Sequence, residues 1–129
     1  MLERWRPPPS PRTNAREPAL GDKILVFKPD KLDLVLSGTK KLEIRAQCYK
    51  AGRYFLGAHS TIYAEAQLGH RVRVESERHW LRLKPKHKSG SPEMPYARTF
   101  AIPILSVKKI RRAYRHPQGA IGIVKYAPP

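Results

Sequence analysis

The sequence has little of several features that would narrow its function at once. Its one cysteine, Cys48, excludes an intramolecular disulfide and a cysteine-based zinc site. Its longest apolar runs, ILVF and AIGIV, are far shorter than the roughly 20 residues that span a bilayer. The N-terminus lacks the continuous apolar segment of a secretory signal. We therefore expect an intracellular protein, cytoplasmic or nuclear, and the arginine-rich N-terminus leaves an organelle destination open.

Acidic residues are also scarce, and this scarcity points to a partner. The chain has 26 Lys and Arg against 10 Asp and Glu, a net charge of +16 with histidines neutral. From His70 onward, fourteen Lys and Arg face only three acidic residues. So large an excess of positive charge repels itself and weakens the folded state unless a polyanion binds and neutralises part of it. We expect RNA or another nucleic acid as the partner, because neutralising phosphates releases counterions. No membrane partner is expected, because no helix with one basic and one apolar face is found.

The 129 residues suffice for one domain preceded by a tail. Residues 1–22 contain five prolines and no apolar periodicity, which predicts a disordered Pro/Arg-rich leader. Residues 23–129 are predicted to form the folded domain.

Short strands dominate the predicted domain, so the fold class is mainly β with some helix. The run KILVF at 23–27 is typical of a buried strand, and residues 28–38 have helical spacing that ends at Gly38. Alternation predicts a strand from Lys41, with Leu42 and Ile44 on one face and Glu43 on the other. Further strands are predicted at 51–60, 61–76, 98–110 and 119–126. In all, five or six strands and one or two short helices are expected, and together they form a small barrel.

The stretch LVLSGTKKLEIR at 34–45 contains the pattern G-x-K-x-x-E-x-R, formed by Gly38, Lys40, Glu43 and Arg45. This pattern, between a short helix and a strand, resembles the ASCH domain (activating signal cointegrator homology) of the PUA-like superfamily. The resemblance extends over most of residues 23–126 and implies a PUA-like β-barrel with a cleft that handles RNA or nucleotides. It also implies that Lys40, Glu43 and Arg45 line the cleft. The alternative from the residues themselves is that Glu43 only bridges Lys41 or Arg45.

Other residues are candidates because of their chemistry. Tyr96, Arg98 and Thr99 combine a ring, a guanidinium and a hydroxyl, groups that stack on and clamp single-stranded bases, although Tyr96 could equally be a core residue. Trp80, among the basic residues of 78–88, is a candidate for phosphate contacts. The candidate nucleic-acid-binding residues are Lys28, Lys40, Glu43, Arg45, Tyr96, Arg98 and Thr99.

The sequence leaves open whether the cleft catalyses a reaction. Some ASCH relatives hydrolyse acetylated cytidine, and others are ribonucleases. In the hydrolase pattern a threonine nucleophile stands where this chain has Glu43, which counts against amide hydrolysis. The catalytic candidates of a ribonuclease or modified-nucleoside hydrolase are Lys40, Glu43 and His116, with His59 weaker. The five histidines have no metal-ligand spacing, so neither a metal nor a cofactor is expected. A protein-interaction module, or a place in a ribonucleoprotein, is the remaining alternative.

Overall fold

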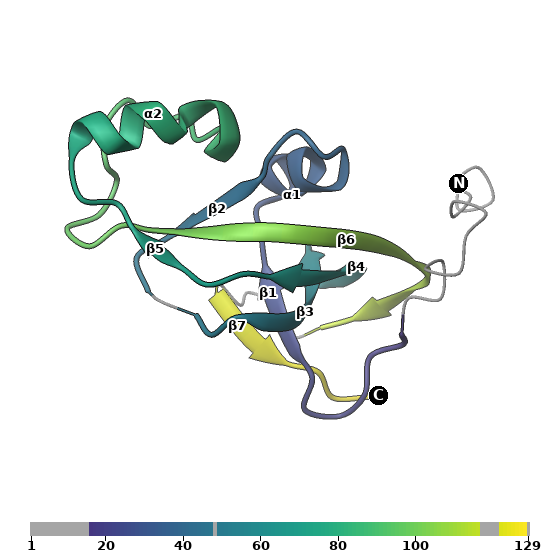
Figure 1. Ribbon diagram of the computed structural model, residues 1–129. Coiled ribbons are helices and arrows are strands. Elements are labelled where there is room, and N and C mark those ends of the chain that lie inside the picture. Colours follow the sequence, from purple (N-terminus) through teal and green to yellow (C-terminus); the bar gives the residue numbers. More distant parts are fainter. Residues whose placement is uncertain (1–15, 48, 117–121, 129) are drawn as a thin grey trace.

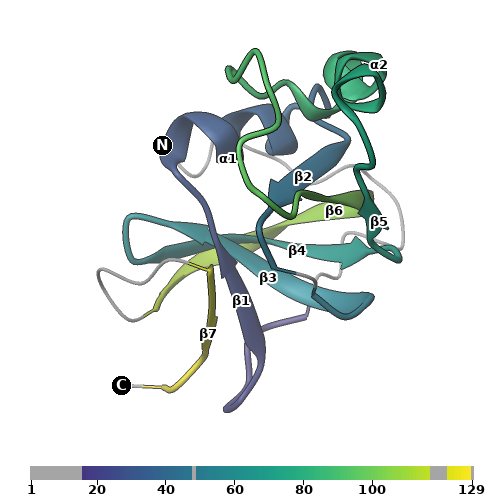
Figure 2. The same ribbon diagram turned by 90° about the vertical axis from the view of Figure 1, so that its left-hand side faces the viewer.

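One curled sheet and two helices make up the structure, a computed structural model that describes residues 16–47, 49–116 and 122–128. The sheet bends into a half-barrel (Figures 1 and 2), with the strand order β2-β6-β4-β3-β1-β7 and β5 beside β6. Among the described residues, only β1 and β3 pair in parallel. The strands are β1 Lys23–Val26, β2 Leu42–Arg45, β3 Gly52–Ala58, β4 Thr61–Leu68, β5 Val72–Arg73, β6 Phe100–Arg115 and β7 Gly122–Lys125. The mainly β fold class is thus confirmed.

The described residues form seven strands, not five or six, because the predicted strand at 61–76 is two strands. Its halves, β4 and β5, pair with successive parts of β6. Between them the β4–β6 register shifts, and the Gly69 N–H donates to the Pro103 carbonyl at 2.8 Å. Pro103 has no N–H to return, so a regular ladder cannot continue there.

Both faces of the sheet are packed. Inside the half-barrel, Leu25 and Phe27 pack with helix α1 (Pro29–Leu36) through Leu32 and Val35. On the outer face, Ile24 and other apolar residues form a second cluster: Val26, Phe55, Ile62 and Tyr126. Because β1 is buried on both faces, it reads as one continuous apolar run in the sequence.

Residues 16–22, the described part of the predicted leader, lie against the sheet. The Arg16 N–H donates to Glu65 at 3.1 Å, and Glu17 accepts a hydrogen bond from the Tyr114 hydroxyl. Gly21 and Asp22 form backbone hydrogen bonds with Tyr126. Residues 1–15 lie outside the described residues.

Helix α1 ends as its sequence predicts. Its C-cap is Ser37, and Gly38 follows with φ +81°, in the left-handed region that favours glycine. The backbone N–H of Lys40 then returns to the Leu34 carbonyl at 2.9 Å. Lys40 therefore belongs to the turn between α1 and β2, as its place just before the predicted strand suggested.

Replacing Gly38 by alanine should test how much this turn depends on glycine. A Cβ at Gly38 would meet no atom within 4 Å, so the expected loss is conformational only, about 1–2 kcal/mol of unfolding free energy. Urea denaturation measures it. Gly90→Ala is the matched control, because Gly90 also has open space but no positive φ, and it should change stability little. Equal losses in both variants would contradict the role given to the turn.

Helix α2 (Glu77–His87) packs on the other side of β2 and forms a small separate core. Ser76 caps its N-terminus by accepting from the His79 N–H at 3.1 Å. Trp80 is completely buried, against Ile44 of β2, Val74 and Ala101. The prediction that Trp80 lies at a phosphate-contacting surface is therefore wrong for its ring, which has no exposed face, although the charged residues around it are exposed.

Candidate functional site

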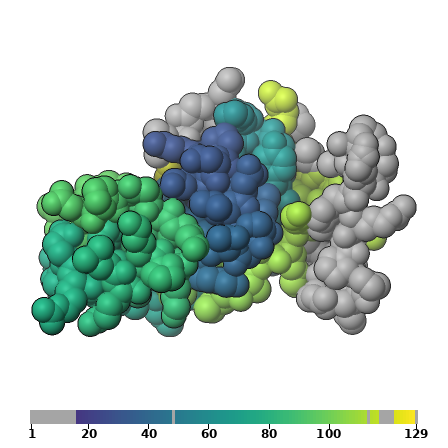
Figure 3. Space-filling model, turned by 90° about the horizontal axis from the view of Figure 1, so that it is seen from above, coloured from purple at the N-terminus to yellow at the C-terminus, as the bar shows by residue number. Residues whose placement is uncertain are grey.

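A pocket of about 350 Å³ opens where the half-barrel fails to close, between the end of β1 and the edge strand β2. Three segments wall it: the β1–α1 junction, the turn and strand carrying the motif, and the segment after α2. Its lining residues are Val26, Phe27, Lys28, Lys31, Lys40, Glu43, Ile44, Arg45, Ser89, Pro95 and Tyr96. Seen from above, α1 with β2 and α2 with its following segment form two adjoining lobes (Figure 3). The pocket therefore gathers residues far apart in the sequence.

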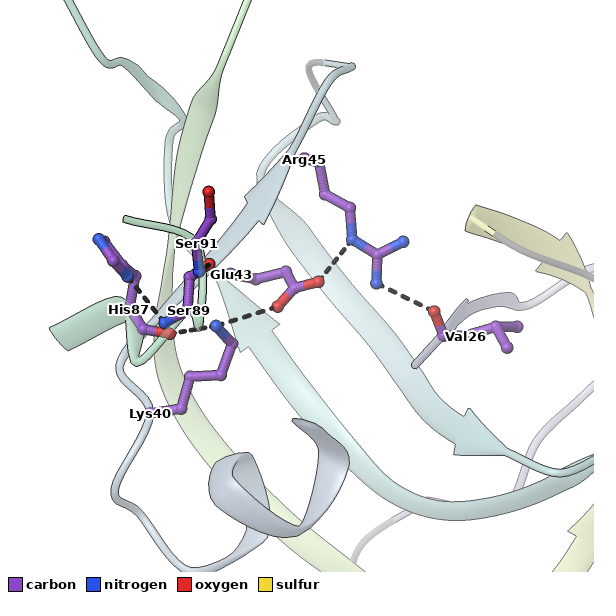
Figure 4. A network of polar contacts seen from close by, with 7 residues as sticks. All are labelled: Val26, Lys40, Glu43, Arg45, His87, Ser89 and Ser91. Atoms are coloured by element: carbon purple, nitrogen blue, oxygen red, sulfur yellow. Dashed lines mark hydrogen bonds and ion pairs between the residues drawn. The ribbon is translucent and has the colours of Figure 1, made fainter. Parts of the chain in front are cut away.

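The three charged residues of the motif are joined in one network (Figure 4). One oxygen of Glu43, Oε2, accepts from Arg45 Nε at 2.5 Å, and the other, Oε1, lies 3.6 Å from Lys40 Nζ. The Arg45 guanidinium also donates to the Val26 carbonyl at 2.9 Å and lies over the Phe27 ring, 5.3 Å from its centroid. Arg45 thus crosses the gap between β2 and β1 and holds the two sides of the pocket together.

Lys40 is held on the far side of this network, buried to 3 % exposure. Its Nζ donates to the carbonyl of His87, at the C-terminal end of α2, where the helix dipole favours a cation. Burial lowers the pKa of Lys40, and the Glu43 carboxylate opposes that shift. The motif lysine therefore links the pocket to α2 as well as to Glu43.

His87 fixes the wall that α2 contributes. Its ring is fully buried and stacks on Trp80, with centroids 3.9 Å apart and planes at 21°. The Ser89 N–H donates to Nδ1 at 2.9 Å, so Nδ1 carries no proton and Nε2 faces the Trp80 carbonyl at 3.3 Å. Burial lowers the pKa of His87, and the positive charge of Lys40 lowers it further. A neutral His87 thus positions Ser89 at the pocket wall.

No family model matches the chain, and no curated protein matches its sequence. Solved structures do match it: with ASCH from Zymomonas mobilis the TM-score is 0.67 at 13 % identity, over 83 % of this chain and 88 % of that chain. The chain has the ASCH fold. Two crystal structures of mutants of the Zymomonas mobilis protein agree, with TM-scores of 0.66 and 0.62 at 14 % identity, over 86 % and 83 % of this chain and 92 % and 91 % of theirs.

Within this ASCH fold, most of the candidate binding residues converge. Lys28, Lys40, Glu43, Arg45 and Tyr96 all line the pocket. The Tyr96 side chain is 44 % exposed, so it is not a core residue. The suggested bridge through Glu43 also exists, to Arg45 and Lys40 and not to Lys41. Glu43 therefore combines the two roles weighed for it: it lines the pocket and holds its cations in place.

Two candidate residues lie elsewhere. Thr99 is completely buried, and its hydroxyl donates to the Tyr96 carbonyl at 3.0 Å and faces the Tyr96 N–H at 3.3 Å. Thr99 therefore shapes the turn that presents Tyr96. Arg98 is exposed and does not line the pocket. Sequence proximity to Tyr96 was the signal for both residues, but the turn directs only the tyrosine to the pocket.

The candidate histidines His59 and His116 also lie outside the pocket. His116 is buried against Gly57, and its backbone N–H donates to the Ser60 carbonyl at 2.9 Å. His59 begins the tight turn after β3, with φ +50°. Neither lines the cavity, so of the catalytic candidates only Lys40 and Glu43 lie in this pocket. In the described ranges, no three His, Cys, Asp or Glu side chains come together as metal ligands.

Sequence reasoning missed Lys31, Ser89, Pro95 and the supporting His87. Lys31 follows Lys28 by three residues, and on a helix this spacing places both on one side, a signal that could have been used. Trp80 and His87, seven residues apart, share a helix face for the same reason. Ser89 and Pro95 had no such signal, because their places depend on how the segment after α2 folds back. No helix among the described residues is long and apolar enough to cross a membrane.

Proposed function

We propose that the protein binds RNA, or a nucleotide, in the pocket at the motif. The observation that carries the proposal is the lining itself: four cationic side chains, one carboxylate and a half-exposed tyrosine line the same cavity. The volume of about 350 Å³ falls within the range of small-ligand sites. Such a lining suits a ligand with an anionic group and a flat ring.

Each part of a nucleotide has a matching group. Lys28 and Lys31 form no ion pair within the described residues, so their charges are available to a phosphate. The Tyr96 ring offers a face on which a base can stack. Arg45 and Glu43 offer donors and acceptors to base edges or ribose hydroxyls, although each already has a partner in the network.

The Tyr96→Ala variant tests the proposal. Base stacking on an aromatic side chain contributes about 1–3 kcal/mol, so affinity for single-stranded RNA should fall roughly 5- to 150-fold. Fluorescence anisotropy with labelled RNA measures the affinity. Tyr63→Ala is the matched control, because Tyr63 lies on β4 with 43 % exposure but does not line the pocket. Equal affinity for RNA in wild type and Tyr96→Ala would contradict RNA binding in the pocket.

A second function, cleavage of RNA or hydrolysis of a modified nucleoside, is favoured by one observation. Lys40 lies in the pocket beside Glu43 with a lowered pKa, and such a lysine can exchange a proton more readily at neutral pH. The same RNA samples are therefore analysed for products. Products that disappear with Lys40→Met would assign catalysis to the pocket, whereas intact RNA at high protein concentration would leave binding alone.

A further inference from the structure

The exposed side of α2 is a strongly basic surface next to the pocket. Between residues 70 and 88, seven Lys and Arg face two acidic residues, and all seven are exposed. One of those two acids, Glu77, is engaged, because its carboxylate accepts from the Met94 N–H at 3.0 Å. The seven basic residues are Arg71, Arg73, Arg78, Arg82, Lys84, Lys86 and Lys88.

Three of these residues form a row along the helix. Arg78, Arg82 and Lys86 follow one another at four-residue spacing, which on an α-helix makes a continuous ridge. Arg78 and Arg82 lie about half a turn from Trp80, whose ring is buried on the opposite side. The ridge therefore faces solvent, and no ion pair within the described residues involves any of the three.

The ridge begins at the pocket. The Lys86 carbonyl accepts from the Lys41 N–H at 2.7 Å, and the next carbonyl, of His87, holds Lys40. Ser89, two residues beyond the end of α2, already lines the cavity. Figure 1 shows α2 above β2 and β5, at the end of β6 that is far from Arg115. A chain leaving the pocket on this side would meet the ridge.

From this arrangement we infer that the ligand is a single-stranded oligonucleotide, with one nucleotide in the pocket and its neighbouring phosphates on the α2 ridge. This inference rests on the proposed function. The eleven residues of α2 span about 16 Å at 1.5 Å per residue. Because a stacked strand has about 3.4 Å per phosphate, α2 is long enough to lie along several consecutive phosphates. A single strand is required because a base must leave its stack to enter the pocket.

The ridge supplies charge alone. Trp80 cannot stack on a base because its ring is buried, and Leu81 is the large apolar side chain of α2 that is exposed, at 56 %. Arginine and lysine bind phosphates independently of sequence. We therefore expect α2 to raise affinity for all sequences alike and to increase the dependence of binding on salt.

The test is the double variant Arg78→Glu/Arg82→Glu. Its probes are a randomised single-stranded RNA of about twelve nucleotides, the same RNA as a duplex, and a mixture of nucleoside monophosphates. Losing two phosphate contacts should weaken single-strand binding about 25-fold at 0.1 M salt and reduce the slope of log affinity against log salt by about 1.4. Affinity for the monophosphates should stay unchanged.

The matched control is Arg111→Glu/Lys125→Glu, which changes the net charge equally at exposed positions on the far part of β6 and on β7. Its loss should be several-fold smaller than that of the α2 variant. Equal losses of RNA affinity in the two variants would mean that only net charge matters. Unchanged affinity in the α2 variant would contradict phosphate binding by the ridge. A duplex bound as tightly as the single strand would overturn the single-strand assignment.

The failures of the two proposals can be told apart. If monophosphates bind wild type and Tyr96→Ala weakens them, while the α2 variant binds the RNA as wild type does, the ridge alone is wrong. If neither RNA nor monophosphates bind wild type, the proposed function is wrong and the ridge loses its basis.

Discussion

Replacing Glu43 by glutamine should lower the free energy of unfolding by about 3 kcal/mol, the lower end of the 3–5 kcal/mol found when one partner of a buried ion pair is removed. The substitution keeps the shape of the side chain but removes its charge. Lys40, 3 % exposed, and Arg45, whose side chain is 13 % exposed, would then lie close together without a counter-charge. Urea denaturation followed by circular dichroism measures the loss.

Glu65→Gln provides the matched control. Glu65 is as buried as Glu43 and also forms an ion pair, with Arg53 at 3.0 Å. The Arg53 side chain is 43 % exposed and can regain water when its partner is lost, so a loss of about 1 kcal/mol or less is expected. Equal losses of unfolding free energy in Glu43→Gln and Glu65→Gln would contradict the claim that the burial of Lys40 and Arg45 makes the loss at Glu43 larger.

The loss at Glu43 should also depend on pH. Glu43 opposes the effect of burial on the pKa of Lys40, so removing its charge lowers this pKa further below the ordinary 10.5. Between the lowered folded pKa and 10.5, the unfolded chain binds more protons than the folded one, and stability rises with pH. The variant should therefore approach the wild type as the pH is raised towards 10. Lys40→Met in the Glu43→Gln background should recover part of the loss at neutral pH, because it removes one of the two cations.

Replacing Trp80 by alanine should remove the pocket wall without unfolding the half-barrel. Trp80 is fully buried in the small core between α2 and β2, and its indole N–H donates to the Ser91 carbonyl at 3.3 Å. Losing such a ring costs about 3–5 kcal/mol. The main core of β1, α1, β3 and β4 is a separate cluster, so it should persist.

Hydrogen exchange followed by mass spectrometry separates the two parts. In Trp80→Ala, the amides of α2 and of residues 88–96 should lose protection, while those of β3 and β4 keep it. Binding of RNA should weaken although Trp80 does not line the pocket, because Ser89, Pro95 and Tyr96 lose their support. Trp80→Phe, which keeps a stacked ring against His87, should retain most of both. Uniform loss of protection across β3, β4 and α2 would show that the two cores unfold together.

Local patterns in the sequence predicted the elements that decide the site. Helical spacing ending at Gly38, followed by alternation from Lys41, placed Lys40 in a turn and separated Glu43 from Ile44. The structure has the same alternation: Ile44 packs in the small core, and Glu43 forms the ion pairs with Lys40 and Arg45, although both residues line the pocket. These features depend on φ at one glycine and on strand parity, which are local properties.

Properties that depend on tertiary contacts could not be predicted from the sequence. The number of strands was too low because the break between β4 and β5 comes from Pro103 on another strand. Trp80 looked like a surface residue because its neighbours are basic, yet the long basic side chains lie on the other side of the same helix. The partner of Lys40 is a carbonyl 47 residues away, which no local pattern specifies.

The Arg45 guanidinium both lines the pocket and spans the gap between the edge strand β2 and the end of β1, through its hydrogen bond to the Val26 carbonyl. A ligand group that competes for that guanidinium would also release the end of β1 from β2. Filling the cavity and loosening the mouth of the barrel are therefore thermodynamically linked through a single side chain, and an occupant that replaces the lost bond to Val26 would be retained longest.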